Sequence, residues 1–348
     1  MTMHIASSPT GSATTLPRQY VHKAAHSEVL LTSWHRRAAD EYTVTAQWPR
    51  THAFYRPAHR LLDPMLFAET ARQTIPLLSH LAYAVPFGHH LIWDHFSYSL
   101  ALGNLHDSTV PAELVLHLSC TDVERRRGDF AATTLRLRAE RDGRHLGTAE
   151  ARFTSHSPTV YRRLRGAYGD LRGALAAARP PATAVPAHLV GRRLSEDVVL
   201  APTGCADRWQ LRIDTEHPAL FDHPVDHVPG MLLLEAARQA AQAARAPLPV
   251  VAVGMETVFH RYVELDAPSW IQVTPAASRD RLRFAVEQGD TVCFSGEVVL
   301  SAPVETAGLP YVPAQQALGA APQNLAPSQP DRRRPAAPCE VPASCRAE

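Results

Sequence analysis

The chain of 348 residues contains one lysine, Lys23, and apart from its histidines all its other basic residues are arginines. This scarcity removes most lysine chemistry, including the phosphate-binding lysine of a P-loop and the lysine of a Schiff base. The formal net charge of +1 gives no electrostatic footprint for nucleic acid. We therefore expect no nucleic-acid partner.

Cysteine is sparse as well, and none of the five cysteines forms a CxxC pair. We therefore expect no metal site and no cofactor, and this cysteine usage favours a reduced, cytoplasmic protein. Residues 1–19 lack the pattern of a signal peptide, and no apolar run approaches the ~18 residues of a membrane helix. A membrane partner is not expected either.

The apolar content of 45% is enough for one large or two ordinary domains. Residues 42–48 (YTVTAQW) alternate between apolar and polar as a half-buried strand does. Residues 63–64 (DP) then indicate the N-cap and first position of a helix over 65–84, kinked or broken near Pro76. Four strand patterns follow, at residues 91–102, 113–120, 133–140 and 145–154.

The second part of the chain repeats this order. A strand pattern at residues 209–214 is followed by a helix over 231–246 and by strand patterns at 252–265, 269–276, 281–287 and 292–300. Between the parts, an Ala- and Pro-rich stretch predicts a linker that is helical around residues 171–178. The expected segments are a disordered start (1–19), a first repeat (20–156), a linker (157–190), a second repeat (191–302) and a disordered tail (303–348).

A short internal match supports a duplication. Residues 65–73 (MLFAETARQ) and 231–239 (MLLLEAARQ) agree at six of nine positions, at an offset of 166. The same offset pairs Gly88 with Gly254, and the order of strands and helix agrees too. Two such units predict an α+β protein with a tandem, or double, hot-dog fold, in which an antiparallel sheet wraps a long helix in each unit.

The segment before the second helix resembles that of hot-dog enzymes with carrier-bound substrates, such as the β-hydroxyacyl-carrier-protein dehydratases. Those enzymes begin the helix with Pro-Gly and place an acidic residue five positions after the Gly, which here corresponds to Gly230 and Glu235. They also use a histidine upstream of the Pro-Gly. His223 and His227 are near that place but not at the usual separation.

A closer resemblance is to the A-factor biosynthesis (AfsA-like) family, over roughly residues 20–300. The residues that carry it are the segments 21–23 (VHK), 68–73 (AETARQ), 152–155 (RFTS), 161–163 (YRR) and 226–239 (DHVPGMLLLEAARQ). The resemblance implies an acyltransferase that moves a β-ketoacyl group from acyl carrier protein to the hydroxyl of dihydroxyacetone phosphate. The ester then closes to a phosphorylated butenolide, the precursor of a γ-butyrolactone signal. It also implies an intramolecular pseudo-dimer of the two repeats.

An alcohol that attacks a thioester needs a base, donors for the oxyanion and positive charge for the phosphate. Glu235 is the candidate base, since burial on the helix raises a carboxyl pKa toward neutrality. The alternative is a salt bridge to Arg238. Arg238 itself is either a phosphate clamp or the group that positions Glu235. The N–H groups of Gly230 and Met231 are the candidate oxyanion donors, at a helix N-terminus.

The duplication predicts an asymmetry between the units. At the offset of 166, Gly230 corresponds to Pro64, which has no N–H. We therefore expect the Glu235 site to be the main catalytic one. The second site, Glu69 with Arg72, is then degenerate, structural or a contributor across the interface between repeats. On this hypothesis Glu235→Gln abolishes product and Glu69→Gln only weakens it.

Other polar residues leave alternatives open. His223 and His227 either bind substrate and shuttle a proton or are ordinary loop residues. Arginines in residues 162–165 either dock an acidic carrier protein, reach the phosphate or form a solvated charge run. Residues 89–94 (HHLIWD) fit the HHxxxD pattern of other acyltransferases, but the pattern is short. Two further functions stay open: a hot-dog thioesterase or dehydratase, and a non-catalytic acyl- or lactone-binding regulator.

Overall fold

The computed structural model describes residues 14–303, which form one antiparallel sheet of twelve strands. The first repeat supplies β1 (Leu31–Ala38), β2 (Glu41–Trp48), β3 (His90–Leu100), β4 (Ala112–Arg126), β5 (Asp129–Arg141) and β6 (Arg144–His156). The second supplies β7 (Leu200–Pro202), β8 (Arg208–Leu211), β9 (Val251–Phe259), β10 (Ser269–Pro275), β11 (Arg281–Gln288) and β12 (Thr291–Ser301). The order is β1-β2-β4-β5-β6-β3-β9-β12-β11-β10-β8-β7, so β3 and β9 join the two repeats.

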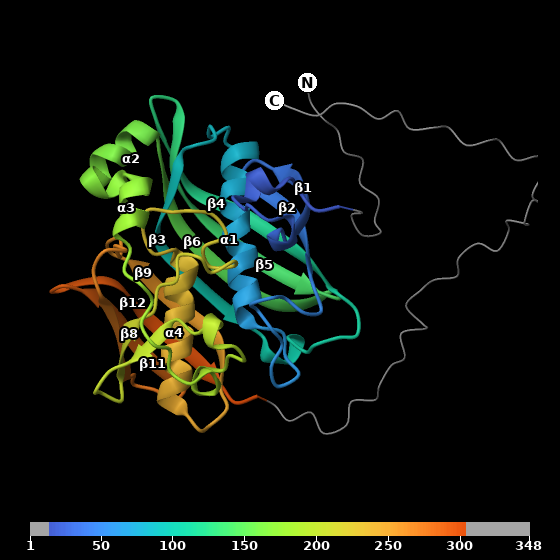
Figure 1. Cartoon of the computed structure of the whole chain (residues 1–348). Coiled ribbons are helices and arrows are strands. Elements are labelled where there is room, and N and C mark those ends of the chain that lie inside the picture. The colour runs from blue at the N-terminus through green and yellow to red at the C-terminus, as the bar shows by residue number, and fades with distance from the viewer. Residues whose placement is uncertain (1–13, 304–348) are drawn as a thin grey trace, which may run out of the picture. The chain divides into compact units, whose positions relative to one another are not determined.

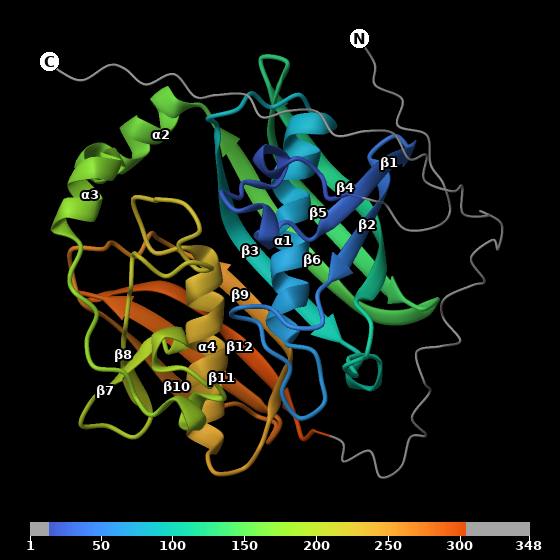
Figure 2. The same ribbon diagram turned by 45° about the vertical axis from the view of Figure 1, so that its right-hand side comes forward.

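The two predicted long helices are α1 (Pro64–Leu81) and α4 (Gly230–Arg245). Figures 1 and 2 show both helices on the same face of the sheet, next to each other. The predicted break near Pro76 is wrong, because α1 continues through this residue. Proline removes one helical hydrogen bond, but nearly every residue of α1 is buried, and this packing holds the helix together.

The strand patterns place one apolar face against the helices. In β4, Leu114, Leu116 and Leu118 are buried and alternate with exposed residues, as the period of two predicts. Two strands were not predicted: β1, whose sequence is mainly polar, and β7, which has only three residues. The predicted strand at 252–265 ends earlier, at Phe259, where the chain leaves the sheet.

The duplication extends beyond the helix match. A turn of 3-10 helix at Arg18–Val21 (η1) has a counterpart at Ala187–Val190 (η5). A second turn at His26–Glu28 (η2) has a counterpart at Ser195–Asp197 (η6). The second repeat thus begins inside the segment predicted as linker. The rest of that segment contains the predicted helix, α3 (Leu171–Ala177), and one not predicted, α2 (Pro158–Arg165).

The predicted disordered ends fall mainly on residues 1–13 and 304–348, which lie outside the described residues. Within the described range, Leu16 is buried and its N–H donates to the Leu31 carbonyl at 2.8 Å. Order therefore begins earlier than predicted. No helix in residues 14–303 has the length and apolar character needed to cross a membrane.

Candidate functional site

The two repeats enclose a cavity of about 700 Å³. Its wall combines residues of α1, the start of β3, α2, the loop before α4, the first turn of α4 and the segment after β9. The apolar part of the wall includes Ile75, Leu91, Trp93, Leu220, Met231 and Phe259. A concave, largely apolar site with a few convergent polar groups is typical of small-molecule binding.

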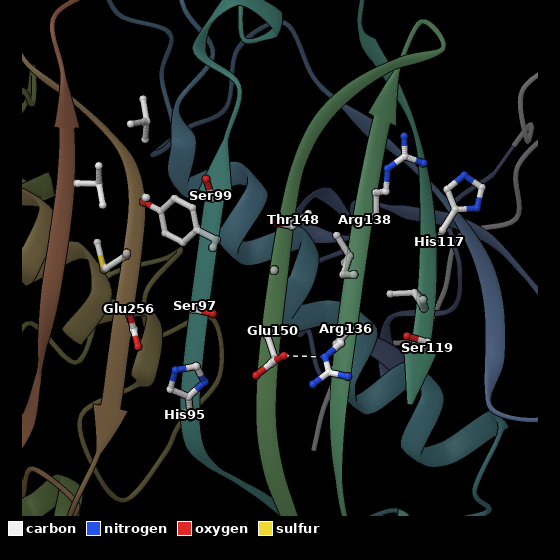
Figure 3. Close-up of a pocket in the computed structure, with 18 of the residues that line it drawn as sticks. His95, Ser97, Ser99, His117, Ser119, Arg136, Arg138, Thr148, Glu150 and Glu256 are labelled. Carbon is white, nitrogen blue, oxygen red and sulfur yellow. Dashed lines mark hydrogen bonds and ion pairs between the residues drawn. The ribbon is translucent and has the colours of Figure 1, made fainter. Parts of the chain in front are cut away.

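A second hollow, of about 980 Å³, lies on the face of the sheet opposite the long helices. Figure 3 shows its side chains projecting from adjacent strands, with Arg136 paired to Glu150. These charges are largely exposed and pair with each other, as Arg281 also does with Glu297. Paired, exposed charges are typical of a solvated sheet face. We therefore take the cavity between the repeats as the candidate site.

In the first repeat, Glu69 is buried and anchors a cluster of charges. Arg72 donates to both carboxylate oxygens, at 2.9 and 2.8 Å, and Lys23 Nζ lies 3.2 Å from Oε1. Gln73 Nε2 donates to the same oxygen at 2.9 Å. Lys23, Glu69 and Arg72 all line the cavity. The only lysine of the chain therefore contributes to this site. The sequence did not predict this contribution.

In the second repeat, Glu235 has the same kind of arginine and glutamine contacts as Glu69, and a second arginine takes the place of Lys23. Arg238 donates to both carboxylate oxygens at 2.9 and 2.8 Å, and Gln239 donates at 2.7 Å. Arg192 adds two further bonds, at 2.8 and 2.7 Å, and also donates to Asp63 at 2.7 Å. Glu235 is fully buried, and neither it nor Arg238 lines the cavity.

The prediction that burial raises the pKa of Glu235 toward neutrality is wrong. Burial alone acts in that direction, but Arg192 and Arg238 outweigh it and lower the pKa of Glu235 to about 2. The predicted alternative, a salt bridge to Arg238, is confirmed. Burial likewise acts to raise the pKa of Glu69, but Arg72 and Lys23 outweigh it and lower that pKa to about 2. Both carboxylates are thus ionised and saturated with cations.

The N-termini of the two helices differ as Gly230 and Pro64 predicted. Asp63 caps α1 by accepting from the N–H of Met65 at 2.9 Å, and Pro64 follows it without an N–H. At α4, Pro229 is the N-cap residue, and no side chain in the described residues caps this end. Gly230 lines the cavity, and as the first residue of α4 its N–H has no partner within the helix.

An aspartate–histidine pair lies on the loop before α4. Nδ1 of His227 donates to Asp226 at 2.6 Å, which leaves Nε2 as an acceptor, and His227 lines the cavity. Tyr161 donates its hydroxyl to both Asp226 oxygens, at 2.8 and 2.9 Å. Burial raises the pKa of Asp226, but the bonds from His227 and Tyr161 outweigh burial and lower that pKa to about 2. The bond to Asp226 therefore fixes the orientation of the His227 ring in the cavity wall.

The same loop reaches the first repeat. Asp222 accepts from the backbone N–H of Ala24 at 2.6 Å and of Ala25 at 3.1 Å. His223 is about half exposed and lines the cavity. These bonds hold the Lys23 segment of one repeat against the histidine loop of the other.

Six of the eight predicted site residues meet in this cavity: Glu69, Arg72, His223, His227, Gly230 and Met231. The other two, Glu235 and Arg238, lie in the second cluster. Three residues of the site were not predicted: Lys23, Tyr161 and Asp226. Each lies in one of the segments that carry the family resemblance. Their pairing was not predicted, because it depends on contacts between distant parts of the chain.

A family model described as the A-factor biosynthesis hotdog domain (AfsA) matches residues 5–157 and 173–302. The chain belongs to this family. The resemblance predicted from the motifs and the predicted double hot-dog fold are thereby confirmed.

Three relatives, each named 2-oxo-3-(phosphooxy)propyl 3-oxoalkanoate synthase, match over most of their length. The protein of Streptomyces virginiae is 43% identical over 286 residues, which is 81% of this chain and 96% of that protein. The Streptomyces coelicolor protein is 41% identical, over 81% of this chain and 90% of its own. The Streptomyces griseus protein is 38% identical, over 82% of this chain and 94% of its own. These names support the predicted enzyme over a non-catalytic binding protein.

Proposed function

We propose that this A-factor biosynthesis family member joins a 3-oxoacyl group, carried as a thioester on acyl carrier protein, to the hydroxyl of dihydroxyacetone phosphate. The product is a phosphorylated ester that can close to a butenolide. The relatives' names describe a synthase of this type of ester. The observation that carries the proposal is the composite cavity, which combines an apolar wall, an oriented histidine, an open helix N-terminus and a cationic cluster.

His227 is the proposed base. The substrate hydroxyl attacks the thioester carbonyl, so a C–O bond forms and the C–S bond breaks. Nε2 of His227 takes the hydroxyl proton and returns it to the departing thiolate, and ionised Asp226 stabilises the imidazolium formed in between. Charge developing on the carbonyl oxygen is met by the N–H groups of Gly230 and Met231.

The cationic cluster is proposed to receive the phosphate. Lys23 and Arg72 line the cavity, and their charges are partly balanced by Glu69. Glu69 is then a positioning residue that holds both cations in place. Glu235, the base proposed from the sequence, becomes its structural counterpart in the second repeat. The working site is thus shared by the two repeats, as in an intramolecular pseudo-dimer.

The place of action is proposed to be the cytoplasm. Cys120, Cys205 and Cys293 are free thiols, as in a reducing compartment.

A direct assay tests the function. Purified protein is mixed with a 3-oxoacyl thioester and dihydroxyacetone phosphate, and the phosphorylated ester or butenolide is sought by mass spectrometry. We expect product from the unaltered protein and a loss of about 10²–10⁴ in rate for His227→Gln. Release of free acid alone, independent of the alcohol, would identify a thioesterase instead. Binding without turnover would identify a regulator.

A further inference from the structure

Helix α2 is fixed to the rim of the cavity by its inner side. Tyr161 is buried and bonds to Asp226, and buried Arg165 donates to Glu264 at 2.7 Å. The Arg165 guanidinium also lies 3.9 Å from the ring centre of Tyr262. Because these contacts involve the loop before α4 and the segment after β9, α2 is held in one position relative to the cavity.

The outer side of this helix is apolar and exposed. Four of the eleven large apolar side chains that are exposed in the described residues fall within positions 160–171: Val160, Leu164, Tyr168 and Leu171. Leu164 has the highest exposure of these, 61%, and it also lines the cavity. Such a concentration beside a cavity mouth indicates a contact surface, because exposed apolar residues are normally scattered.

Positive charge accompanies these apolar side chains. Arg162 and Arg163 are exposed, and neither side chain has an ion pair or hydrogen bond with any described residue. Arg261, on the cavity rim next to Tyr262, is also exposed and has no such side-chain partner. Uncompensated arginines around an apolar patch are complementary to an acidic protein surface.

We propose that Val160, Arg162, Arg163, Leu164 and Tyr168, here called the α2 face, dock an acidic carrier protein whose thioester-bearing arm enters the cavity past Leu164. This inference rests on the proposed function, since it identifies where the acyl donor binds. The arm reaches the reacting centre directly, because Leu164 shares the cavity wall with His227 and Gly230. The face consists of one short helix and the turn after it, which suits a small protein rather than an extended surface such as a membrane.

The test compares two donors with the same acyl group. One is the 3-oxoacyl carrier protein, and the other is the 3-oxoacyl thioester of N-acetylcysteamine, which has no protein to dock. For the double variant Arg162→Glu/Arg163→Glu we expect kcat/KM to fall at least about tenfold with the carrier donor and to stay unchanged with the small donor. The salt dependence of the carrier reaction should weaken too. Val160→Ser tests the apolar part in the same way.

A matched control reverses the charge of two arginines outside the cavity wall, in Arg60→Glu/Arg144→Glu. It should leave kcat/KM with both donors unchanged. Unchanged carrier kinetics in Arg162→Glu/Arg163→Glu would overturn the docking inference. An equal fall with both donors would overturn it as well, because the change would then lie in the cavity. Loss of binding to anionic phospholipid vesicles without any change in carrier kinetics would identify a membrane surface. If the unaltered enzyme transfers from neither donor, the proposed function itself has failed.

Discussion

Helices α1 and α4 each bury a Glu-x-x-Arg-Gln sequence, and the contacts within the two clusters match closely. Each arginine donates two hydrogen bonds to its glutamate. It also donates one to a backbone carbonyl, that of Val21 in one repeat and that of Val190 in the other. Each glutamine bridges its glutamate to a turn of 3-10 helix. Yet only the cluster of Glu69 lines the cavity.

The difference arises from the second cation of each cluster, Lys23 or Arg192, and from the helix N-terminus that lies nearby. Arg192 joins Glu235 to Asp63, the cap of α1, and all three residues are buried and lie outside the cavity wall. Lys23 reaches Glu69 without closing off the cavity, and the N-terminus of α4 stays open. One cluster is thus a buried ion network, and the other lines the cavity.

The largest expected effect is on stability, when the bridging cation of the closed cluster is removed. Arg192→Met leaves two buried carboxylates short of a partner and should lower the free energy of unfolding by about 3–5 kcal/mol. Lys23→Met should cost less, since Lys23 lies 3.2 Å from Glu69 and 3.8 Å from Glu28, whereas Arg192 forms three bonds of 2.7 to 2.8 Å with its two carboxylates. Urea unfolding monitored by circular dichroism measures both. Equal losses would show that the two clusters are not divided into structural and functional roles.

Next in size is the exchange of helix N-termini. Gly230→Pro copies Pro64, and the extended backbone of Pro229 accepts a following proline. Loss of one oxyanion donor should lower kcat by about 10²–10³ while the fold is retained. Gly230→Ala is the control, because the added Cβ meets its nearest atoms, in Phe259 and Trp93, at 3.5 and 3.6 Å, which is ordinary contact. Comparable rates for the two variants would remove this amide from the mechanism.

Acid should affect the two clusters alike. The pKa values of Glu69 and Glu235 are lowered to about 2 from an ordinary value of 4.5. A lowered carboxyl pKa adds stability that is present above the ordinary value and is lost as pH falls toward the lowered one. The free energy of unfolding should therefore decline between pH ~4.5 and ~2. Glu69→Gln and Glu235→Gln should each remove a similar share of this decline, whereas only Glu69→Gln should reduce transfer.

The smallest expected change in stability is at a backbone position. His22 has φ 50° at the end of η1, where the second repeat has Gly191 at φ 66°. His22→Gly relieves the cost of a left-handed side-chain residue but removes the 2.8 Å bond between the rings of His22 and His80. We expect the two effects nearly to cancel, within about 1 kcal/mol. Because the ring lines the cavity, transfer should still slow. A large stability loss with normal turnover would instead make His22 purely structural.

Most of the fold could be predicted from local pattern. Strand patterns in the sequence located ten of the twelve strands, and the DP and PG dipeptides marked the starts of α1 and α4. The two strands that were not predicted, β1 and β7, are polar or very short. Their place in the sheet depends on pairing with β2 and β8. Helix α2 was not predicted because its buried residues, Tyr161 and Arg165, are polar and have their partners in distant segments.

The sequence by itself determined the duplication, the two helices that carry it and the contrast between Gly230 and Pro64. Tertiary structure alone decided which glutamate lines the same cavity as that open N-terminus: it is Glu69 of the other repeat rather than Glu235 of the same helix. The physical reason is that a residue five positions along a helix lies more than one turn from its N-terminus, whereas the neighbouring helix lies directly alongside. Tertiary structure also decided the pKa of Glu235. Burial raises an acid's pKa and neighbouring cations lower it, and the cation Arg192 comes from a distant part of the chain.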